Sequence, residues 1–185
     1  IPDSKIIEIK SGEKEKTLST CEHIWNELTE MGCSRKSLLV NLGGGVIGDM
    51  GGFCAATFKR GIRFINVPTT LLSQVDASIG GKLGIDFTGL KNHIGLFKEP
   101  DAVIIHPPFL KTLSEREIKS GFAEIVKHSL IYDADQWDHL VKTSFQQLDW
   151  NDLIPKSVAI KHGIVAQDPL EEGLRKILNF GHTLG

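Results

Sequence analysis

The sequence predicts an α/β fold whose strands all lie in the first half of the chain and whose second half is helical. Short apolar runs stand at residues 37–42, 64–68 and 102–106, and only helical patterns follow Pro107. Uninterrupted runs rich in β-branched residues suit strands that are covered on both faces. We therefore expect an α/β domain over residues 1–107 and an all-helical domain over residues 108–185.

The first helix is expected ahead of these strands, over residues 17–32. Leu18, Cys21 and Leu28 belong to a set of apolar residues that recurs at intervals of three and four, as in an amphipathic helix. Gly32 follows as the stop signal. The short strands over residues 37–42, 64–68 and 102–106 come after it.

The second half begins with a helix that its own sequence caps. Ser114 is followed three residues later by Glu117, which is a capping box, and this predicts a helix over residues 114–131. Two more helices are expected over residues 134–148 and 152–166.

Composition excludes several classes of function. The chain has 185 residues, of which 41% are hydrophobic and 24% are charged, with a net charge of -2. This balance gives no electrostatic preference for nucleic acid or for an anionic membrane, and no apolar stretch reaches membrane-spanning length. Three cysteines fit neither a metal pattern nor a disulfide framework, and Ile1 begins without a signal peptide or a basic leader. We therefore expect a cytoplasmic protein with reduced thiols.

A glycine-rich turn follows the first strand. Gly43, Gly45 and Gly48 satisfy the pattern G-x-G-x-x-G at the point where a strand ends and a helix can begin. Bare backbone N–H groups at a helix start can hold a pyrophosphate, although the same pattern also occurs in turns that are purely structural. The acid expected about 20 residues further on in a dinucleotide site is absent, and Pro68 begins a Pro-Thr-Thr run there instead.

Polar residues gather beside glycines in two further segments. Residues 67–82 contain Thr69, Thr70, Asp76 and Lys82, and a second segment contains Lys91 and Asn92. Lysines beside glycines and an asparagine favour a site for a phosphorylated, anionic small molecule. The alternative is that each is an ordinary solvated loop residue.

The helical half adds potential metal ligands. Glu124, Lys127 and His128 share one face of the predicted helix over residues 114–131. His182 comes much later, in a segment that also holds Arg175 and Asn179. A carboxylate with imidazoles is the ligand set of a catalytic zinc, which takes three protein groups and keeps an open position. A solvated glutamate and packed or exposed histidines remain the alternative.

Taken together, these motifs resemble the 3-dehydroquinate synthase family. The resemblance runs in order through GGGVIGDMGGF, KRG, VPTTLLSQVDASIGGK, KNHIG, GFAEIVKH and GLRKILNFGHTLG. It implies a modified Rossmann-like NAD-binding domain joined to a helical metal and substrate domain. It also accounts for the missing acid, because in this family the adenosine contacts precede the glycine turn, where this chain has Glu13 and Lys16.

The resemblance implies the following site residues. The NAD contacts would be Glu13, Lys16, Gly44, Gly45, Val46, Asp49, Thr69, Thr70, Lys82, Lys91, Phe109, Thr112 and Leu113. A divalent metal, zinc or cobalt, would take Glu124 and His182 as two of three ligands. The substrate contacts would be Arg60, Asp76, Lys82, Asn92, Lys127, Lys161, Arg175 and Asn179. Catalytic roles would fall to Lys127, Asp76, Asn92 and Lys82.

The implied reaction converts 3-deoxy-D-arabino-heptulosonate 7-phosphate to 3-dehydroquinate and phosphate. The steps would be transient oxidation by NAD, phosphate elimination, re-reduction and an intramolecular aldol closure. Arg60 matches an arginine that reaches a neighbouring subunit's substrate phosphate, which implies a homodimer. His128 matches no role in the family and is interpreted as a surface or packing residue.

Relative to the family, the chain is short at both ends. Two of three zinc ligands are present, so we expect these 185 residues alone to bind zinc poorly and to turn over little substrate. Three other functions stay open: a related sugar-phosphate cyclase that makes inosose or valiolone rings, a metal-dependent polyol dehydrogenase, and a noncatalytic NAD-binding module.

Overall fold

The computed structural model describes residues 4–181, and these form two compact units. Unit 1 extends to Val67 and includes Gly81–Ile104, and unit 2 consists of Pro68–Gly80 with the residues from Ile105 onward. The change from one unit to the other after Ile104 lies near the expected boundary at residue 107. The sequence placed residues 68–80 in the first domain, whereas the structure places them in unit 2.

Packing explains why Pro68–Gly80 belongs to unit 2. This segment contains a short π-helical turn, η3 (Ser73–Ala77), which contacts the long helices α3 and α5 of that unit. Leu71 and Val75 are fully buried in the core of unit 2, together with Ile125 and Leu153. The segment therefore contributes two core side chains to unit 2.

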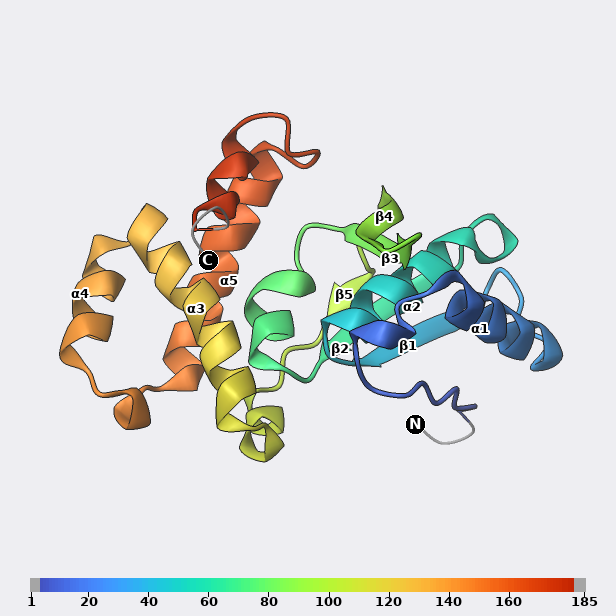
Figure 1. Cartoon of the computed structure of the whole chain (residues 1–185), viewed down its shortest axis with the longest axis horizontal. Coiled ribbons are helices and arrows are strands. Elements are labelled where there is room, and N and C mark those ends of the chain that lie inside the picture. The colour runs from blue at the N-terminus through green and yellow to red at the C-terminus, as the bar shows by residue number, and fades with distance from the viewer. Residues whose placement is uncertain (1–3, 182–185) are drawn as a thin grey trace. The chain divides into compact units, whose positions relative to one another are not determined.

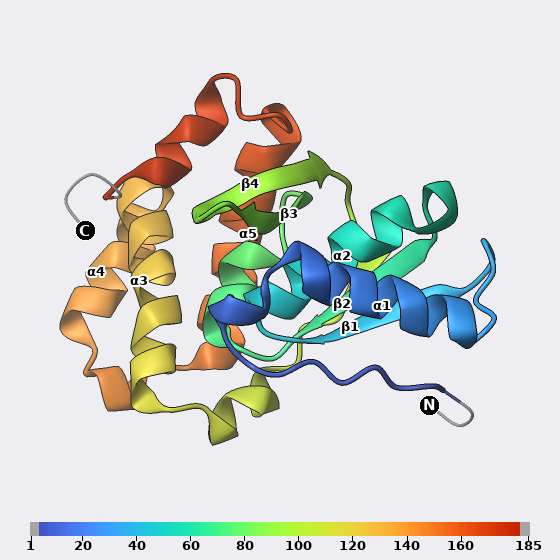
Figure 2. The same ribbon diagram turned by 45° about the vertical axis from the view of Figure 1, so that its right-hand side comes forward.

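Unit 1 contains a small sheet with two helices beside it (Figure 2). Its strands β1 (Leu38–Gly43), β2 (Arg63–Pro68) and β5 (Ala102–Val103) follow the order β1-β2-β5, and β2 pairs parallel with β5. The helices are α1 (Leu18–Glu30) and α2 (Gly45–Thr57), and α2 contacts both α1 and β1. A parallel pair and its helices confirm the predicted α/β class.

Strand β1 differs from the prediction that both of its faces would be covered. Leu38 and Leu42 are 48% and 60% exposed, whereas Asn41, on the opposite face, is buried. Helix α2 packs on the Asn41 face, and among the described residues the other face stays open.

The structure adds a hairpin that the sequence analysis did not anticipate. Strands β3 (Lys82–Phe87) and β4 (Leu90–Phe97) pair antiparallel, so Lys82, Lys91 and Asn92 lie on strands, and the alternative that they are ordinary loop residues is wrong. Thr88 and Gly89 connect the strands with φ of 50° and 81°. Two residues with positive φ form the turn that best matches the twist of paired strands.

Unit 2 is helical, as predicted (Figure 1). Its helices are α3 (Glu115–Tyr132), α4 (Ala134–Lys142) and α5 (Trp150–Gln167). The short turn η4 (Pro107–Thr112) precedes α3, η5 (Phe145–Gln147) lies between α4 and α5, and η6 (Leu174–Asn179) follows α5. Ser114 caps α3 by accepting a hydrogen bond from the backbone N–H of Glu117, as its sequence predicts. Helix α4 ends at Lys142, ahead of the predicted residue 148, because Thr143 is extended.

The cysteines and the helices bear on disulfides and membrane spans. Cys21, Cys33 and Cys54 are free thiols. Within residues 4–181 no helix combines the length and the apolar character needed to cross a membrane.

Candidate active site

The glycine turn of unit 1 ends β1 and starts α2. Gly44 is the N-cap, and the 13-residue helix begins at Gly45. The first backbone N–H groups of a helix have no partner inside it and carry its positive end, so they suit an anionic diphosphate. A Cβ added to Gly43 would lie 2.8 Å from the Ile47 side chain, which explains why a side chain is excluded there.

A buried lysine joins three separate segments of unit 1. Lys16 Nζ donates to Asp49 Oδ2 at 2.6 Å and to Asn92 Oδ1 at 2.5 Å, and Lys16 is only 3% exposed. Lys16 precedes α1, Asp49 lies in α2 and Asn92 lies in β4. The resemblance assigned Lys16 and Asp49 to NAD and Asn92 to substrate, and the structure brings all three into direct contact.

Other predicted residues of unit 1 lie on its surface. Glu13 and Lys91, both expected to contact NAD, form an exposed ion pair with 3.6 Å between Glu13 Oε1 and Lys91 Nζ. Lys82 is exposed on β3. Arg60 is also exposed and has a φ of 68°, directly after Lys59 with a φ of 50°.

Unit 2 holds a cluster of ionisable side chains from three segments. Asp76 of η3 accepts hydrogen bonds from Lys161 of α5, with Nζ 2.5 Å from Oδ1 and 2.6 Å from the Asp76 carbonyl oxygen. On α3, Glu124 and Lys127 form an ion pair one turn apart. Lys127 and Lys161 are both buried. The cluster therefore contains two buried ammonium groups, each paired with one carboxylate.

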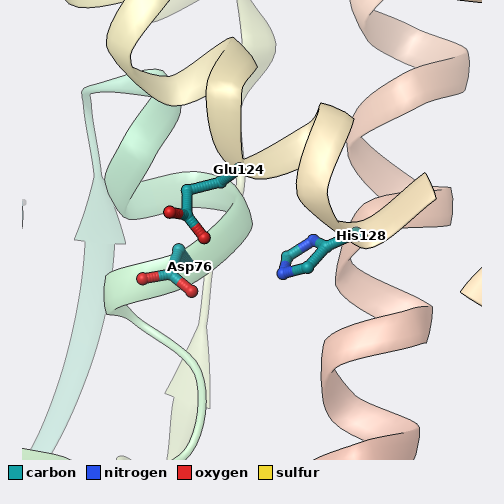
Figure 3. Close-up of side chains that lie close together, drawn as sticks. All are labelled: Asp76, Glu124 and His128. Atoms are coloured by element: carbon teal, nitrogen blue, oxygen red, sulfur yellow. The ribbon is translucent and has the colours of Figure 1, made fainter. Parts of the chain in front are cut away.

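His128 completes this cluster. It is fully buried, its Nδ1 lies 2.6 Å from Ser157 Oγ, and its Nε2 has no hydrogen-bond partner among the described residues. One potential metal-ligating atom from each of Asp76, Glu124 and His128 lies within 4.8 Å of the others (Figure 3). Of the two interpretations offered for His128, the structure supports packing and excludes the surface.

The electrostatics of the cluster follow from burial and charge pairing. Burial alone would raise the pKa of Asp76, but Lys161, together with Lys127, lowers it below its ordinary value. Burial lowers the pKa of Lys161, and Asp76 only partly opposes this effect. Burial also lowers the pKa of His128 to about 4, against an opposing effect of Asp76, so its imidazole is neutral at neutral pH.

These donors fit a divalent metal. Carboxylate oxygens and imidazole nitrogen are zinc ligands, and the unpartnered Nε2 of His128 lies beside both carboxylates. Glu124, one of the two predicted ligands, is a member of this set. His182, the other, lies outside the described residues.

Residues predicted to enclose the dinucleotide from unit 2 have local structural partners. Thr70 and Ser73 bond reciprocally at the start of η3, with their hydroxyl oxygens 2.8 Å apart, and Thr69 directly precedes this pair. In η4, Thr112 donates to the carbonyl oxygen of Phe109 at 3.3 Å. Leu113 follows and packs against the core of unit 2.

The two predicted substrate residues of the last turn differ in environment. Arg175 is 2% exposed, and its guanidinium donates to the carbonyl oxygens of Pro169 at 2.6 Å and of Gly80 at 2.9 Å. Asn179 is exposed and donates to Glu171 Oε1 at 2.9 Å.

Ser157 is the residue of this site that the sequence analysis missed. It is fully buried in the middle of α5, and its hydroxyl meets His128 across 29 residues of chain. A lone serine inside a helical pattern carries no signal for such a contact, which only the packing of α3 against α5 creates.

Comparison with known proteins identifies close relatives. The chain is 49% identical over 183 residues to 3-dehydroquinate synthase of Parabacteroides distasonis, covering 97% of this chain and 52% of that protein. It is 50% identical over 185 residues to the enzyme of the same name from Sulfurovum sp., covering 100% of this chain and 53% of that protein. The chain therefore spans about half the length of the curated relatives it matches.

Solved structures of related cyclases share the fold. A 2-deoxy-scyllo-inosose synthase complexed with carbaglucose-6-phosphate, NAD+ and Co2+ matches with a TM-score of 0.87 at 28% identity, over 97% of this chain and 50% of that chain. The 2-epi-5-epi-valiolone synthase of Streptomyces hygroscopicus, with NAD+ and Zn2+ bound, matches with a TM-score of 0.85 at 30% identity, over 94% and 51%.

Family models extend the match through both halves of the chain. The model of the N-terminal part of 3-dehydroquinate synthase covers residues 6–120, and the model of its C-terminal part covers residues 121–185. These two segments are contiguous and include the glycine turn as well as Glu124 and Lys127. The chain belongs to the 3-dehydroquinate synthase family.

Proposed function

We propose that the protein carrying this chain is a 3-dehydroquinate synthase, which forms 3-dehydroquinate and phosphate from 3-deoxy-D-arabino-heptulosonate 7-phosphate. The observation that carries the proposal is the cluster of Asp76, Glu124, Lys127 and Lys161 in a chain of this family. These four side chains come from three segments and are held in fixed, mostly buried positions, as electrostatic catalysis requires.

NAD is proposed to bind in unit 1 at the glycine turn. Gly44, Gly45 and Val46 present the first N–H groups of α2 to the diphosphate, and Asp49 lies in the same helix. Lys16 holds Asp49 by its short ion pair and so fixes the acid for contact with a ribose. When held by these residues, NAD would supply reversible hydride-transfer chemistry. The remaining proposed contacts are Glu13, Thr69, Thr70, Lys82, Lys91, Phe109, Thr112 and Leu113.

A divalent metal, zinc or cobalt, is proposed to bind at Glu124 and His182. These residues would hold the ion, which would supply Lewis-acid chemistry toward the substrate hydroxyl groups. Lys127 forms an ion pair with Glu124, so the carboxylate has a counter-charge when no metal is bound.

The cationic side chains are proposed to recognise a substrate that carries both a carboxylate and a phosphate. Lys82, Lys127, Lys161 and Arg175 provide ammonium and guanidinium donors, which are the groups that bind such anions. The ammonium group of Lys161 donates to the carbonyl oxygen and to Oδ1 of Asp76. Asp76 therefore orients this ammonium group before a substrate binds. Asn92 and Asn179 supply neutral hydrogen bonds.

Arg60 is proposed to contact the substrate phosphate of a second copy in a homodimer. Its exposure, and the left-handed turn that projects it, support this assignment. Cytoplasmic location is proposed together with the biosynthetic role.

Phosphate release tests the function. Protein expressed from its own gene, supplied with NAD and zinc, is expected to release phosphate from the heptulosonate phosphate. It should act far more slowly on hexose or heptulose phosphates that lack a carboxylate. Preference for a substrate without the carboxylate would support an inosose or valiolone cyclase instead. The same assay on the 185 residues alone tests the expectation that they turn over little substrate.

A noncatalytic NAD-binding module is the competing proposal from another class. Calorimetry separates the two, because such a module binds NAD but shows no heat with zinc or with the sugar acid. For the enzyme, heats are expected with all three.

A further inference from the structure

We infer that His128 and Asp76, together with Glu124, form a three-donor site for a divalent cation that does not depend on His182. One potential ligand atom from each of the three side chains lies within 4.8 Å of the others. All three residues belong to unit 2, on η3 and α3. The inference concerns metal binding alone and does not rest on the proposed reaction.

The imidazole of His128 has a buried nitrogen without a hydrogen-bond partner among the described residues. His128 is fully buried, and its Nε2 has no hydrogen-bond partner within residues 4–181. Burying a polar atom without a partner costs roughly 1–3 kcal/mol, so such atoms in folded proteins call for a specific explanation. Figure 3 shows the ring edge of His128 directed toward the carboxylates of Asp76 and Glu124.

Ser157 contacts the other ring nitrogen of His128. Its hydroxyl oxygen lies 2.6 Å from Nδ1, the ring nitrogen other than the unpartnered Nε2. When Nδ1–H donates to the Ser157 hydroxyl, Nε2 keeps a lone pair that can bind a cation together with the two carboxylates. Metal-bound histidines characteristically donate their other ring N–H to an oxygen acceptor, which fixes the ring orientation.

Each carboxylate of the cluster pairs with one lysine, so a bound divalent cation shares the two carboxylates with two ammonium groups. Lys161 contacts Oδ1 and the main chain of Asp76, and Lys127 contacts Oε2 of Glu124. Each carboxylate therefore has a second oxygen that its lysine does not hold. In the absence of metal, the two ammonium groups neutralise the two carboxylates and keep the donors in place.

Zinc titration of variants tests the inference. Calorimetry with Zn2+ alone is carried out on the purified protein and on His128→Gln, Ser157→Ala and His182→Gln. His128→Gln is expected to raise the zinc Kd by about tenfold or more, and Ser157→Ala by a smaller factor, because it removes only the group that orients the ring. His182→Gln is expected to leave binding by the three-donor site measurable. His162→Gln, an exposed histidine of α5, is the matched control and should bind zinc as the unmodified protein does.

Several outcomes would overturn the inference. Zinc binding by His128→Gln as tight as in the unmodified protein would do so, as would loss of all binding in His182→Gln alone. If His128→Gln does not fold, unchanged zinc affinity in Asp76→Asn and Ser157→Ala would have the same meaning. A protein that binds zinc through His128 yet releases no phosphate would retain this site and contradict only the proposed function.

Discussion

Lys161 reaches Asp76 across 85 residues of chain and donates to its carboxylate at 2.5 Å and to its main-chain carbonyl oxygen at 2.6 Å. One ammonium thus fixes both the side chain and the backbone of η3 on helix α5. Lys161 is 6% exposed and the Asp76 side chain is 28% exposed, so water only partly replaces either partner when the other is removed.

Replacement of this lysine should be costly. Lys161→Met is expected to lower the free energy of unfolding by about 3 kcal/mol, since the carboxylate loses its buried counter-charge. Urea denaturation measures the change. Lys156→Met, on the same helix, breaks an exposed ion pair with Asp152 and should cost less than about 0.5 kcal/mol. Equal losses in the two variants would show that the Asp76 contact contributes nothing special.

The neutral, buried imidazole of His128 predicts a dependence of stability on pH. Its pKa is about 4 in the folded protein against an ordinary 6.5, chiefly because of burial, with Lys127 and Lys161 acting in the same direction and Asp76 opposing. Between these values the unfolded chain binds a proton that the folded protein does not, so the free energy of unfolding falls as pH decreases from 6.5 to about 4.

The pH effect is measured by denaturation in the presence of a chelator. Each unit of pKa difference is worth about 1.4 kcal/mol, and His128→Gln should remove this part of the pH dependence. Asp76 acts in a separate range, because its lowered pKa affects stability only below its ordinary value of 3.8. An unchanged slope above pH 4 in His128→Gln would contradict the prediction.

Lys16 links three segments of unit 1, so its loss should weaken NAD binding. Lys16→Met removes the ammonium group that donates to Asp49 and to Asn92. The Kd for NAD is expected to rise by about tenfold or more, equivalent to about 1.4 kcal/mol. Calorimetry with NAD measures it, and Lys14→Met, an exposed neighbour, is the control. NAD affinity that is the same in both variants would exclude this role of Lys16.

Helix α2 approaches the sheet so closely that Gly51 has no room for a side chain. A Cβ there would lie 2.1 Å from Asn41 Oδ1, and Asn41 itself donates to Asn66 at 2.9 Å. Gly51→Ala should destabilise the protein by about 1–3 kcal/mol through overpacking. Adding Asn41→Ala makes space and should recover part of this loss, so the two changes are not additive.

A second glycine serves as the control for Gly51. Gly163 lies in α5 with open space around it, so Gly163→Ala should stabilise the protein by up to about 1 kcal/mol. Thermal unfolding of the three variants and the double variant decides the matter. Additive effects of the Asn41 and Gly51 changes would disprove their contact.

Local signals predicted much of the fold. Thr17 and Ser114 cap α1 and α3 through their own side chains. The helix ends predicted from the apolar spacing lie within a few residues of the observed ends of α1 and α3. The glycine turn was recognised because a strand and a helix flank it. The hairpin at Thr88-Gly89 was missed because a glycine interrupts each strand and the first four residues of β4 are exposed, so the apolar residues of the pair do not stand out as runs.

The site was only partly predictable for a related reason. Glu124, Lys127 and His128 share a helix, so spacing alone placed them together. The contact of Asp76 with Lys161 spans 85 residues, and it depends on how η3 packs against α5. No local pattern encodes such a contact, and the resemblance supplied roles for these residues but not their hydrogen bonds.

The most direct test of the proposed function compares phosphate release by Glu124→Gln with release by the unmodified protein. Both proteins are expressed from the complete gene, and both are assayed with NAD and zinc. The variant should keep the fold and the NAD affinity, because unit 1 is untouched, and should release phosphate at least about a hundredfold more slowly, since it loses a metal ligand. Glu115→Gln, an exposed change in the same helix, should release phosphate at the normal rate. Undiminished release by Glu124→Gln would contradict the account.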